Sequence, residues 1–187
     1  MHADNWANKA KQMGYRSRAV FKLEEILNKV VLNNKLKNVL DIGSSPGGWS
    51  QYIIKRYKKA RVYAVDVLEM DPIEGVNFYQ ESVENINNID EINKLKGKFN
   101  LVISDIAPNL TGISAVDSEN VLDLNHLTIN TAHKFLEKGG ALIMKTFQNN
   151  NLKSLRKNME LLFKLVQTYK PAASKKQSGE IYLYGVK

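Results

Sequence analysis

The chain contains no cysteine, so disulfide bonds and thiolate metal sites are excluded. It has no apolar run near the roughly 20 residues that a membrane-spanning helix needs, and residues 1–18 lack the apolar stretch of a secretory signal. We therefore expect an intracellular protein without membrane association, in the cytoplasm of a bacterium or in a mitochondrion or another organelle of a eukaryote. His126 and His133 stand seven residues apart, but no cysteine or third histidine lies near them in the sequence, so no metal site is predicted.

The charge of the chain is divided into three blocks. Its 187 residues carry a net charge of +8. Residues 1–61 hold 13 Lys and Arg against 4 acids, residues 62–144 hold 5 against 13, and residues 145–187 hold 9 against 2. Two basic ends favour a polyanion such as a nucleic acid as the partner, although a lysine-rich surface that is merely solvated is the simpler alternative. With 43% hydrophobic residues, we expect a monomer with one domain over residues 1–187, whose basic segment 1–30 contributes to RNA binding.

The pattern of apolar residues alternates between strands and helices, which predicts an α/β fold. Strands are expected at residues 38–43, 61–67, 76–80, 99–105, 140–147, 164–169 and 180–186. Helices are expected at residues 17–30, 47–57, 84–96, 117–137 and 151–163. Gly139 and Gly140 are interpreted as the stop of the fourth of these helices. Such alternation predicts a seven-stranded, mostly parallel sheet, in which the last two strands form an antiparallel pair because no helix separates them.

The turn "DIGSSPGGWS", residues 41–50, joins the first strand to a helix and is rich in glycine. Glycine permits a tight turn and a close approach to a ligand, and the helix that follows offers free N–H groups. Pro46 departs from the G-x-G-x-x-G pattern of nicotinamide sites. Asp66 ends the second strand, where an acid accepts hydrogen bonds from ribose hydroxyls. Together these features predict an adenosine-containing cofactor, against the simpler readings of a tight connection and a capping aspartate.

Three further charged residues are predicted at the rim formed by the carboxyl ends of the strands, where ligands bind in such sheets. Lys145 interrupts the apolar run "ALIMKTF", and lysine is rarely buried without a partner. Asp105 ends the strand at residues 99–105. Glu180 begins the last strand, which runs antiparallel and therefore starts at the same rim; a solvated glutamate is the alternative there. Lys22 lies beside the core face of an early helix, where a surface lysine with a buried stem is the alternative.

These stretches together resemble the FtsJ/RrmJ-type RNA ribose 2′-O-methyltransferases, which use S-adenosylmethionine. The similarity is carried by "YRSRAVFKL", "DIGSSPGGWSQY", "DVLEMDPI", "SDIAPN", "GALIMKTFQ" and "SGEIYLYG", which span residues 15 to 184. The resemblance implies a Rossmann-like methyltransferase fold with helices on both faces of the sheet and an antiparallel last strand. It implies a catalytic tetrad formed by Lys22, Asp105, Lys145 and Glu180. It also implies cofactor contacts from Gly43, Pro46, Gly47, Gly48, Trp49, Asp66 and Asp105.

The chain departs from this family where an acid usually contacts the adenine. The stretch "QESVE" places Ser82 at that position, with Glu81 and Glu84 as its neighbours. Ser82 is therefore the expected contact to the adenine, and the resemblance does not show how a serine replaces the acid.

The predicted function is transfer of a methyl group from S-adenosylmethionine to a ribose 2′-hydroxyl in large-subunit ribosomal RNA, with Lys145 as the general base. Phosphate contacts are expected from basic residues near the two ends of the chain, namely Lys9, Lys11, Arg16, Arg18, Lys170, Lys175 and Lys176. Transfer RNA or the messenger-RNA cap is the alternative substrate. A non-catalytic RNA-binding assembly factor is the alternative outside catalysis, and a nicotinamide oxidoreductase is disfavoured by the missing glycine pattern.

Overall fold

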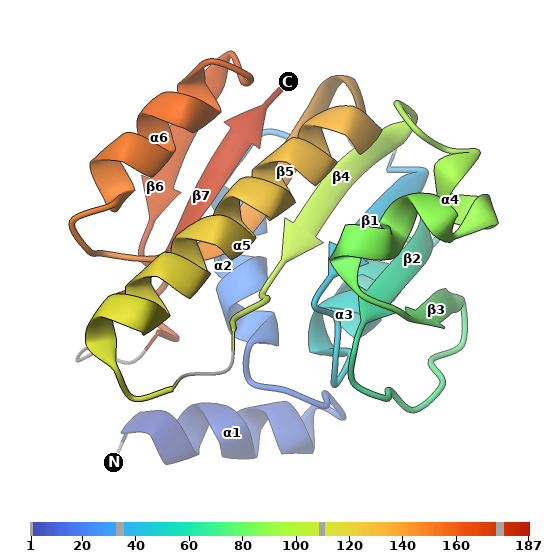
Figure 1. Cartoon of the computed structure of the whole chain (residues 1–187). Helices are drawn as coiled ribbons and strands as arrows, with labels where there is room; N and C mark the ends of the chain where they lie inside the picture. The colour runs from blue at the N-terminus through green and yellow to red at the C-terminus, as the bar shows by residue number, and fades with distance from the viewer. Residues whose placement is uncertain (1, 33–35, 109–110, 175–177) are drawn as a thin grey trace.

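The computed structural model describes residues 2–32, 36–108, 111–174 and 178–187 (Figure 1). Its strands form one seven-stranded sheet in the order β3-β2-β1-β4-β5-β7-β6. The strands are β1 (Asn38–Ile42), β2 (Arg61–Asp66), β3 (Val76–Gln80), β4 (Phe99–Ser104), β5 (Leu136–Phe147), β6 (Leu165–Tyr169) and β7 (Glu180–Val186). The pairs from β3 through β5 are parallel, and β7 runs antiparallel to both β5 and β6. The predicted α/β sheet with an antiparallel last strand is confirmed.

Helices cover both faces of this sheet. The helical elements are α1 (His2–Gln12), α2 (Val20–Lys29), α3 (Gly48–Arg56), the 3-10 helix η1 (Val83–Asn88), α4 (Asp90–Asn93), α5 (Ser114–Phe135) and α6 (Leu152–Glu160). Figure 1 shows α4, α5 and α6 in front of the sheet, α2 and α3 behind it, and α1 lying across the end toward which β4 points. None of the described helices combines the length and apolar character needed to cross a bilayer.

Each face of the sheet has its own apolar core, because successive residues of a strand point to opposite sides. On the side of α2 and α3, Val39 and Leu101 pack with Trp49 and Tyr182. On the side of α5 and α6, the neighbouring residue Leu40 packs with residues that include Phe135. Burial on both faces explains why the central strands are almost continuously apolar, and it leaves charged residues only at the strand ends.

Two sequence-based boundaries were wrong. The helix expected at 84–96 is split into η1 and α4. Helix α5 ends at Phe135, before Gly139 and Gly140, which lie inside β5. The reason is strand pairing: Leu136 already pairs with Phe99, and the register then shifts. A Cβ on Gly140 would lie 2.9 Å from the carbonyl oxygen of Phe99, so Gly140 accommodates a close strand contact, and Gly139 adopts φ +81° within the strand.

Candidate active site

The charged residues predicted at the rim do meet there. The register pairs Ile42 of β1 with Ser104 of β4, and Ser104 with Met144 of β5. Asp105 and Lys145 are the next residues along β4 and β5, so parallel pairing brings them side by side. Because β7 runs the other way, its first residue, Glu180, reaches the same rim.

The catalytic tetrad implied by the family resemblance forms two ion pairs. Lys22 Nζ lies 2.7 Å from Glu180 Oε1 and 2.8 Å from Oε2. Lys145 Nζ lies 3.2 Å from Asp105 Oδ1 and also donates a hydrogen bond to the Asp105 backbone carbonyl. Lys22 is only 7% exposed. Its ion pair with Glu180 therefore offsets the free-energy cost of removing the charged lysine from water. We call these four residues the charged cluster.

Tyr182 of β7 joins the two pairs and was missed by the sequence analysis. Its hydroxyl donates a hydrogen bond of 2.9 Å to Asp105 Oδ1, and its ring lies 5.9 Å from Lys22 Nζ. Burial, together with the negative charges of Asp105 and Glu180, raises the pKa of Tyr182 well above its ordinary value, so the hydroxyl stays a donor. The period-two spacing from Glu180 to Tyr182 was the available signal, because it places both side chains on one face of the strand.

Glu180 is held in its ionised form. Burial raises its pKa, but hydrogen bonds from Lys22 and Ser174 and the charges of Lys22 and Lys145 outweigh this, so the pKa of Glu180 lies below its ordinary value. Ser174 Oγ donates to Glu180 Oε1 at 2.7 Å. Glu180 therefore carries a fixed negative charge that anchors Lys22. The ammonium of Lys145, in contrast, has three donor positions and uses two of them on Asp105 in the part of the chain that is described.

A cavity of about 740 Å³ opens beside Asp105 at the carboxyl ends of β1 and β2. This volume lies within the usual range of about 300 to 1,000 Å³ for small-molecule sites. Gly43, Asp66, Ser82 and Asp105, all predicted cofactor contacts, line it. The exposed apolar side chain of Leu68 also lines it and offers a surface for an aromatic base. We call this space the large cavity.

A small cavity of about 40 Å³ lies beneath the glycine-rich turn and is lined by Asp41, Ser44 and Asp105, among other residues. Ser44 Oγ is buried there without a hydrogen-bond partner among the described residues. Asp41 is 1% exposed and accepts a 2.6 Å hydrogen bond from Ser50 Oγ. Burial raises the pKa of Asp41 to about 7 despite that bond, and the charges of Asp105 and Asp66 add to the rise. An unpartnered hydroxyl and a carboxyl beside the glycine-rich turn fit the amino-acid end of S-adenosylmethionine, which carries both an ammonium and a carboxylate group.

The turn at residues 43–48, which we call the cofactor turn, requires its glycines. Gly43 has φ +73° and Gly47 has φ +101°, values that side chains rarely adopt. A Cβ on Gly43 would lie 2.5 Å from Ile106 Cβ, and one on Gly47 would lie 2.5 Å from Ile73 Cδ1. Gly48 begins α3 and lines the small cavity with Pro46. The cofactor turn is therefore tightly packed at Gly43 and Gly47. Its residues line both the large and the small cavity.

Trp49 is predicted to contact the cofactor, and in the structure it also makes contacts within the protein. Its side chain is 3% exposed, and Nε1 donates a 2.8 Å hydrogen bond to the Ala19 carbonyl. Its ring lies 5.8 Å from that of Tyr182. Trp49 also lines the small cavity, so it links the cofactor turn to the charged cluster, and its contact with the cofactor stays a prediction.

The residues predicted to contact RNA phosphates are spread over the two ends of the chain. Lys9 and Lys11 lie on α1, which crosses the end of the sheet where the strands carry the charged cluster (Figure 1). Lys9 Nζ lies 4.8 Å from the ring of Phe21, and Lys170 donates to the backbone carbonyl of Ser178. Arg16 donates to three backbone carbonyls, Arg18 is half-buried, and Lys175 and Lys176 fall outside the described residues. The phosphate contacts stay predictions.

The fold is a mostly parallel seven-stranded sheet, with a glycine-rich cofactor turn, an acid at the end of β2 and a Lys-Asp-Lys-Glu cluster at the rim. Together these features define a Rossmann-like methyltransferase. Residues 15–187 match the model of the FtsJ-like methyltransferase family, and the chain belongs to this family. It is an S-adenosylmethionine-dependent methyltransferase. The resemblance inferred from the sequence is thereby confirmed.

Named relatives and solved structures agree with this assignment. Ribosomal RNA large subunit methyltransferase E of Wigglesworthia glossinidia brevipalpis is 38% identical, over 99% of this chain and 92% of the relative. The protein of the same name from Hydrogenovibrio crunogenus is 40% identical over 96% and 89% of the two chains. The crystal structure of a ribosomal RNA methyltransferase from Plasmodium falciparum is 33% identical with a TM-score of 0.79, covering 92% of this chain and 97% of that one.

Proposed function

We propose that this protein transfers the methyl group of S-adenosylmethionine to a ribose 2′-hydroxyl of large-subunit ribosomal RNA. The observation that carries the chemistry is the position of Lys145. Its Nζ contacts Asp105 twice, and Asp105 lines both the large and the small cavity; a neutral amine that donates both N–H groups to Asp105 keeps its lone pair free for a proton. The names of the relatives, which act on ribosomal RNA, support the substrate.

The bound cofactor supplies an electrophilic methyl group attached to a positively charged sulfur. Three groups of the chain position it: Asp66 holds the ribose hydroxyls, Ser82 meets the adenine, and the cofactor turn encloses the amino-acid end. The Asp66 carboxylate already accepts hydrogen bonds from the backbone N–H groups of Ser45 (2.8 Å) and Leu68 (2.9 Å). Each oxygen keeps a second lone pair for a ribose hydroxyl, so the acid is oriented before the cofactor binds.

The charged cluster orients and deprotonates the target hydroxyl. Lys145, in its neutral form, would accept the proton of the 2′-hydroxyl at Nζ as the oxygen–methyl bond forms and the methyl–sulfur bond breaks, which leaves S-adenosylhomocysteine. Asp105 holds Nζ next to both cavities, and Tyr182 fixes the Asp105 carboxylate. Glu180 neutralises the charge of Lys22, so Lys22 and Lys145 can lie in one site. Close alignment of the hydroxyl and the methyl group contributes the rest of the rate enhancement.

The basic ends of the chain supply the electrostatic attraction to RNA. The protein is a monomer with a single domain over residues 1–187. Segment 1–30, whose helix α1 lies across the rim, is part of this domain and contributes to RNA binding. Affinity for RNA therefore falls steeply as salt is added. An exposed ribose in single-stranded or loop RNA gives the most direct access to Lys145. The enzyme acts where ribosomal RNA is made, in the cytoplasm of a bacterium or in an organelle of a eukaryote.

The experiment is transfer of labelled methyl from S-adenosylmethionine to undermethylated large ribosomal subunits, with free ribosomal RNA, transfer RNA and capped messenger RNA in parallel. Lys145→Ala is compared with Lys138→Ala, which removes an exposed lysine from the far end of β5. We expect label in ribosomal RNA with wild type and Lys138→Ala but not with Lys145→Ala. Label only in transfer RNA or in the cap would move the substrate, and no label despite tight cofactor binding would favour an assembly factor.

A further inference from the structure

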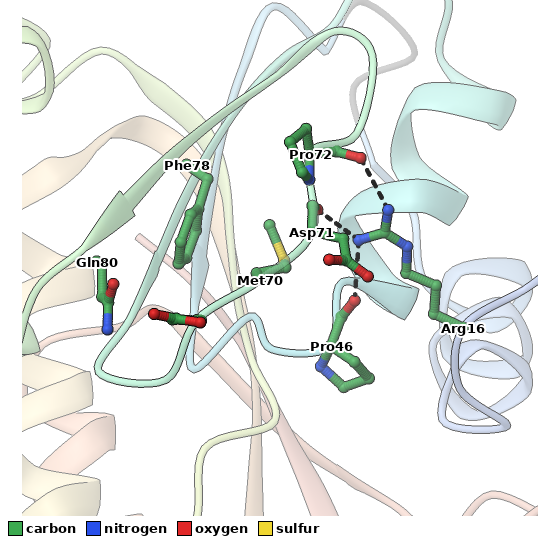
Figure 2. A pocket seen from close by; sticks show the side chains of 8 residues that line it. Arg16, Pro46, Met70, Asp71, Pro72, Phe78 and Gln80 are labelled. Carbon is green, nitrogen blue, oxygen red and sulfur yellow. Dashed lines mark hydrogen bonds between the residues drawn. The ribbon is translucent and has the colours of Figure 1, made fainter.

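Arg16 occupies a position unlike that of a phosphate-binding side chain. Its guanidinium donates to the backbone carbonyls of Asp71 (2.6 Å from Nη1), Pro72 (2.8 Å from Nη2) and Pro46 (3.3 Å from Nη1), as Figure 2 shows. Pro46 belongs to the cofactor turn, and Asp71 and Pro72 belong to the loop that follows β2. One side chain therefore bridges two loops that are separate in sequence.

The two loops fit closely where Arg16 joins them. Ser45 Oγ donates a 3.1 Å hydrogen bond to the Glu69 carbonyl, which adds a second link between the cofactor turn and the loop at residues 69–72. A Cβ on Gly47 would lie 2.9 Å from Met70 Sδ and 3.4 Å from Arg16 Nη1. The spacing of these loops thus sets the conformation of the cofactor turn.

The backbone around Arg16 is anchored as well. Its N–H donates to Gln51 Oε1 at 3.1 Å, and Gln51 Nε2 donates to the Gly14 carbonyl at 3.0 Å. Gln51 lies in the first turns of α3, the helix that begins at the cofactor turn. The connection between α1 and α2 is therefore fixed to α3, whose first residues line the small cavity.

The chain of hydrogen bonds from Arg16 continues to Asp66, the acid at the end of β2. Ser45, which bonds to the Glu69 carbonyl, also donates its N–H to Asp66 Oδ2. The contacts thus run from Arg16 through the loop at 69–72 and the cofactor turn to Asp66. Three carbonyls in different directions match the planar, five-donor guanidinium, whereas a lysine ammonium at the end of a flexible stem cannot reproduce that arrangement.

We propose that Arg16 is a positioning residue for cofactor binding, which holds the cofactor turn and the loop at 69–72 at the spacing that shapes the cofactor site, and that it is not a phosphate contact. The proposal rests on the cofactor and on the geometry around Arg16, and it does not depend on which RNA is methylated. It replaces the role predicted for Arg16 from charge alone.

The test is the affinity for S-adenosylhomocysteine, measured by calorimetry without RNA, for wild type, Arg16→Lys, Arg16→Ala and Lys11→Ala. We expect both Arg16 variants to bind S-adenosylhomocysteine more weakly, by about tenfold or more, because each loses hydrogen bonds that organise the site. Lys11, which is exposed on α1, serves as the comparison, and Lys11→Ala binds S-adenosylhomocysteine as wild type does. Thermal unfolding checks that Arg16→Lys, which keeps the charge, is folded.

A second measurement separates positioning from phosphate contact. With S-adenosylhomocysteine saturating, the salt dependence of RNA affinity is compared for the same proteins. Loss of one phosphate contact lowers the slope of log affinity against log salt concentration by about one unit. A lysine at the same position restores the slope, because it also carries a positive charge. We expect the slope of Arg16→Ala to equal that of wild type. Unchanged S-adenosylhomocysteine affinity in Arg16→Lys, or a lower salt slope in Arg16→Ala that Arg16→Lys restores, would overturn the proposal. Failure of wild type to bind ribosomal RNA would contradict the proposed substrate, and the calorimetric result would still decide the role of Arg16.

Discussion

The two halves of the rim solve different problems. Over β4, β5 and β7, charged side chains pair with each other across long stretches of sequence, as Lys22 does with Glu180. Over β1, β2 and β3, the carboxylates accept hydrogen bonds from nearby amide groups instead: Asp66 from Ser45 N–H, and Glu81 from Ser82 N–H and Asn85 Nδ2. In the described chain, no salt bridge joins these two acids to a cation.

This difference assigns the charged cluster to the reaction and the side of β1, β2 and β3 to cofactor binding. The charged cluster is complete before any ligand arrives, so its order costs nothing at the moment of reaction. The cofactor side presents acceptors and a buried carboxyl around open space, which suits a ligand that brings positive charge and hydroxyl donors. Changes on the first side should therefore alter the rate, and changes on the second should alter cofactor affinity.

The largest expected effect is that of Lys145→Ala on the methyl-transfer rate. Loss of a general base lowers the single-turnover rate by about 100- to 10,000-fold, while affinity for S-adenosylhomocysteine stays within about twofold. Rapid-quench single-turnover assays and calorimetry measure the two quantities. The matched change on the cofactor side is Gly43→Ala, whose Cβ would meet the backbone of Ile106 at 2.8 Å. It should weaken S-adenosylhomocysteine first; weaker cofactor binding in Lys145→Ala would break the distinction between the two sides.

A second effect concerns stability on the charged side. Lys22→Ala leaves Glu180 buried without its main partner, which destabilises the fold by about 3 kcal/mol. Because the pKa of Glu180 lies below its ordinary value, this loss is fully present at pH 7 and shrinks as the pH falls through that lowered pKa. Urea unfolding at pH 7 and at acid pH measures it.

Lys29→Ala is the control for that effect, since it breaks a more exposed pair with Glu25. It should cost about 0.5 kcal/mol or less. Equal losses for Lys22→Ala and Lys29→Ala would show that burial does not distinguish the two pairs, and the view of a preorganised cluster would fail.

A third effect concerns Asp41 on the cofactor side. The pKa of its carboxyl is raised to about 7, so the folded protein keeps a proton that the unfolded chain releases above about pH 4. Wild-type stability therefore declines as the pH rises from about 4 to 7, by on the order of 3 to 4 kcal/mol. Asp41→Asn removes this decline and still accepts the hydrogen bond from Ser50. Unfolding free energies at pH 5 and pH 8 measure the difference.

Glu74→Gln, an exposed change in the loop after β2, is the control for Asp41. We expect it to change stability by less than about 0.5 kcal/mol at both pH values. If Asp41→Asn gains no stability relative to wild type between pH 5 and pH 8, Asp41 is not buried as a neutral acid.

The cofactor side could be predicted from the sequence further than the charged side. The cofactor turn and Asp66 lie close together in the chain, and glycine conformations are encoded locally. Asp105, Lys145 and Glu180 could be placed at the rim from strand order, but the pairing of Lys22 with Glu180 joins residues 158 positions apart. The family resemblance grouped these two residues in one tetrad, but it did not predict that they pair.

Other features had no local signal. The acceptors of Arg16 are backbone carbonyls, which every residue has, so its charge suggested a phosphate contact instead. Gly139 and Gly140 looked like a helix stop, because the contact that requires Gly140 is with Phe99, a partner on another strand. In both cases the deciding contact lies far away in sequence and leaves no pattern near the residue itself.

The smallest effect tests the departure at Ser82, which accepts a hydrogen bond from Glu84 N–H at the start of η1. Ser82→Asp keeps this cap, because aspartate is an equally good N-cap residue. It also gives the adenine amino group a charged acceptor, and charge-assisted hydrogen bonds are stronger than neutral ones. We expect S-adenosylhomocysteine to bind about three- to tenfold more tightly, as measured by calorimetry.

Ser82→Asn separates the charge of the new side chain from its shape. Asparagine also caps η1, but its amide is a neutral acceptor, so its affinity should stay near that of wild type. If Ser82→Asp binds less tightly than Ser82→Asn, repulsion from Glu81, which lines the same cavity, outweighs the new bond. The serine would then be the residue that this crowded, acidic side of the rim can accommodate, and the adenine amino group would have its partner elsewhere in the large cavity.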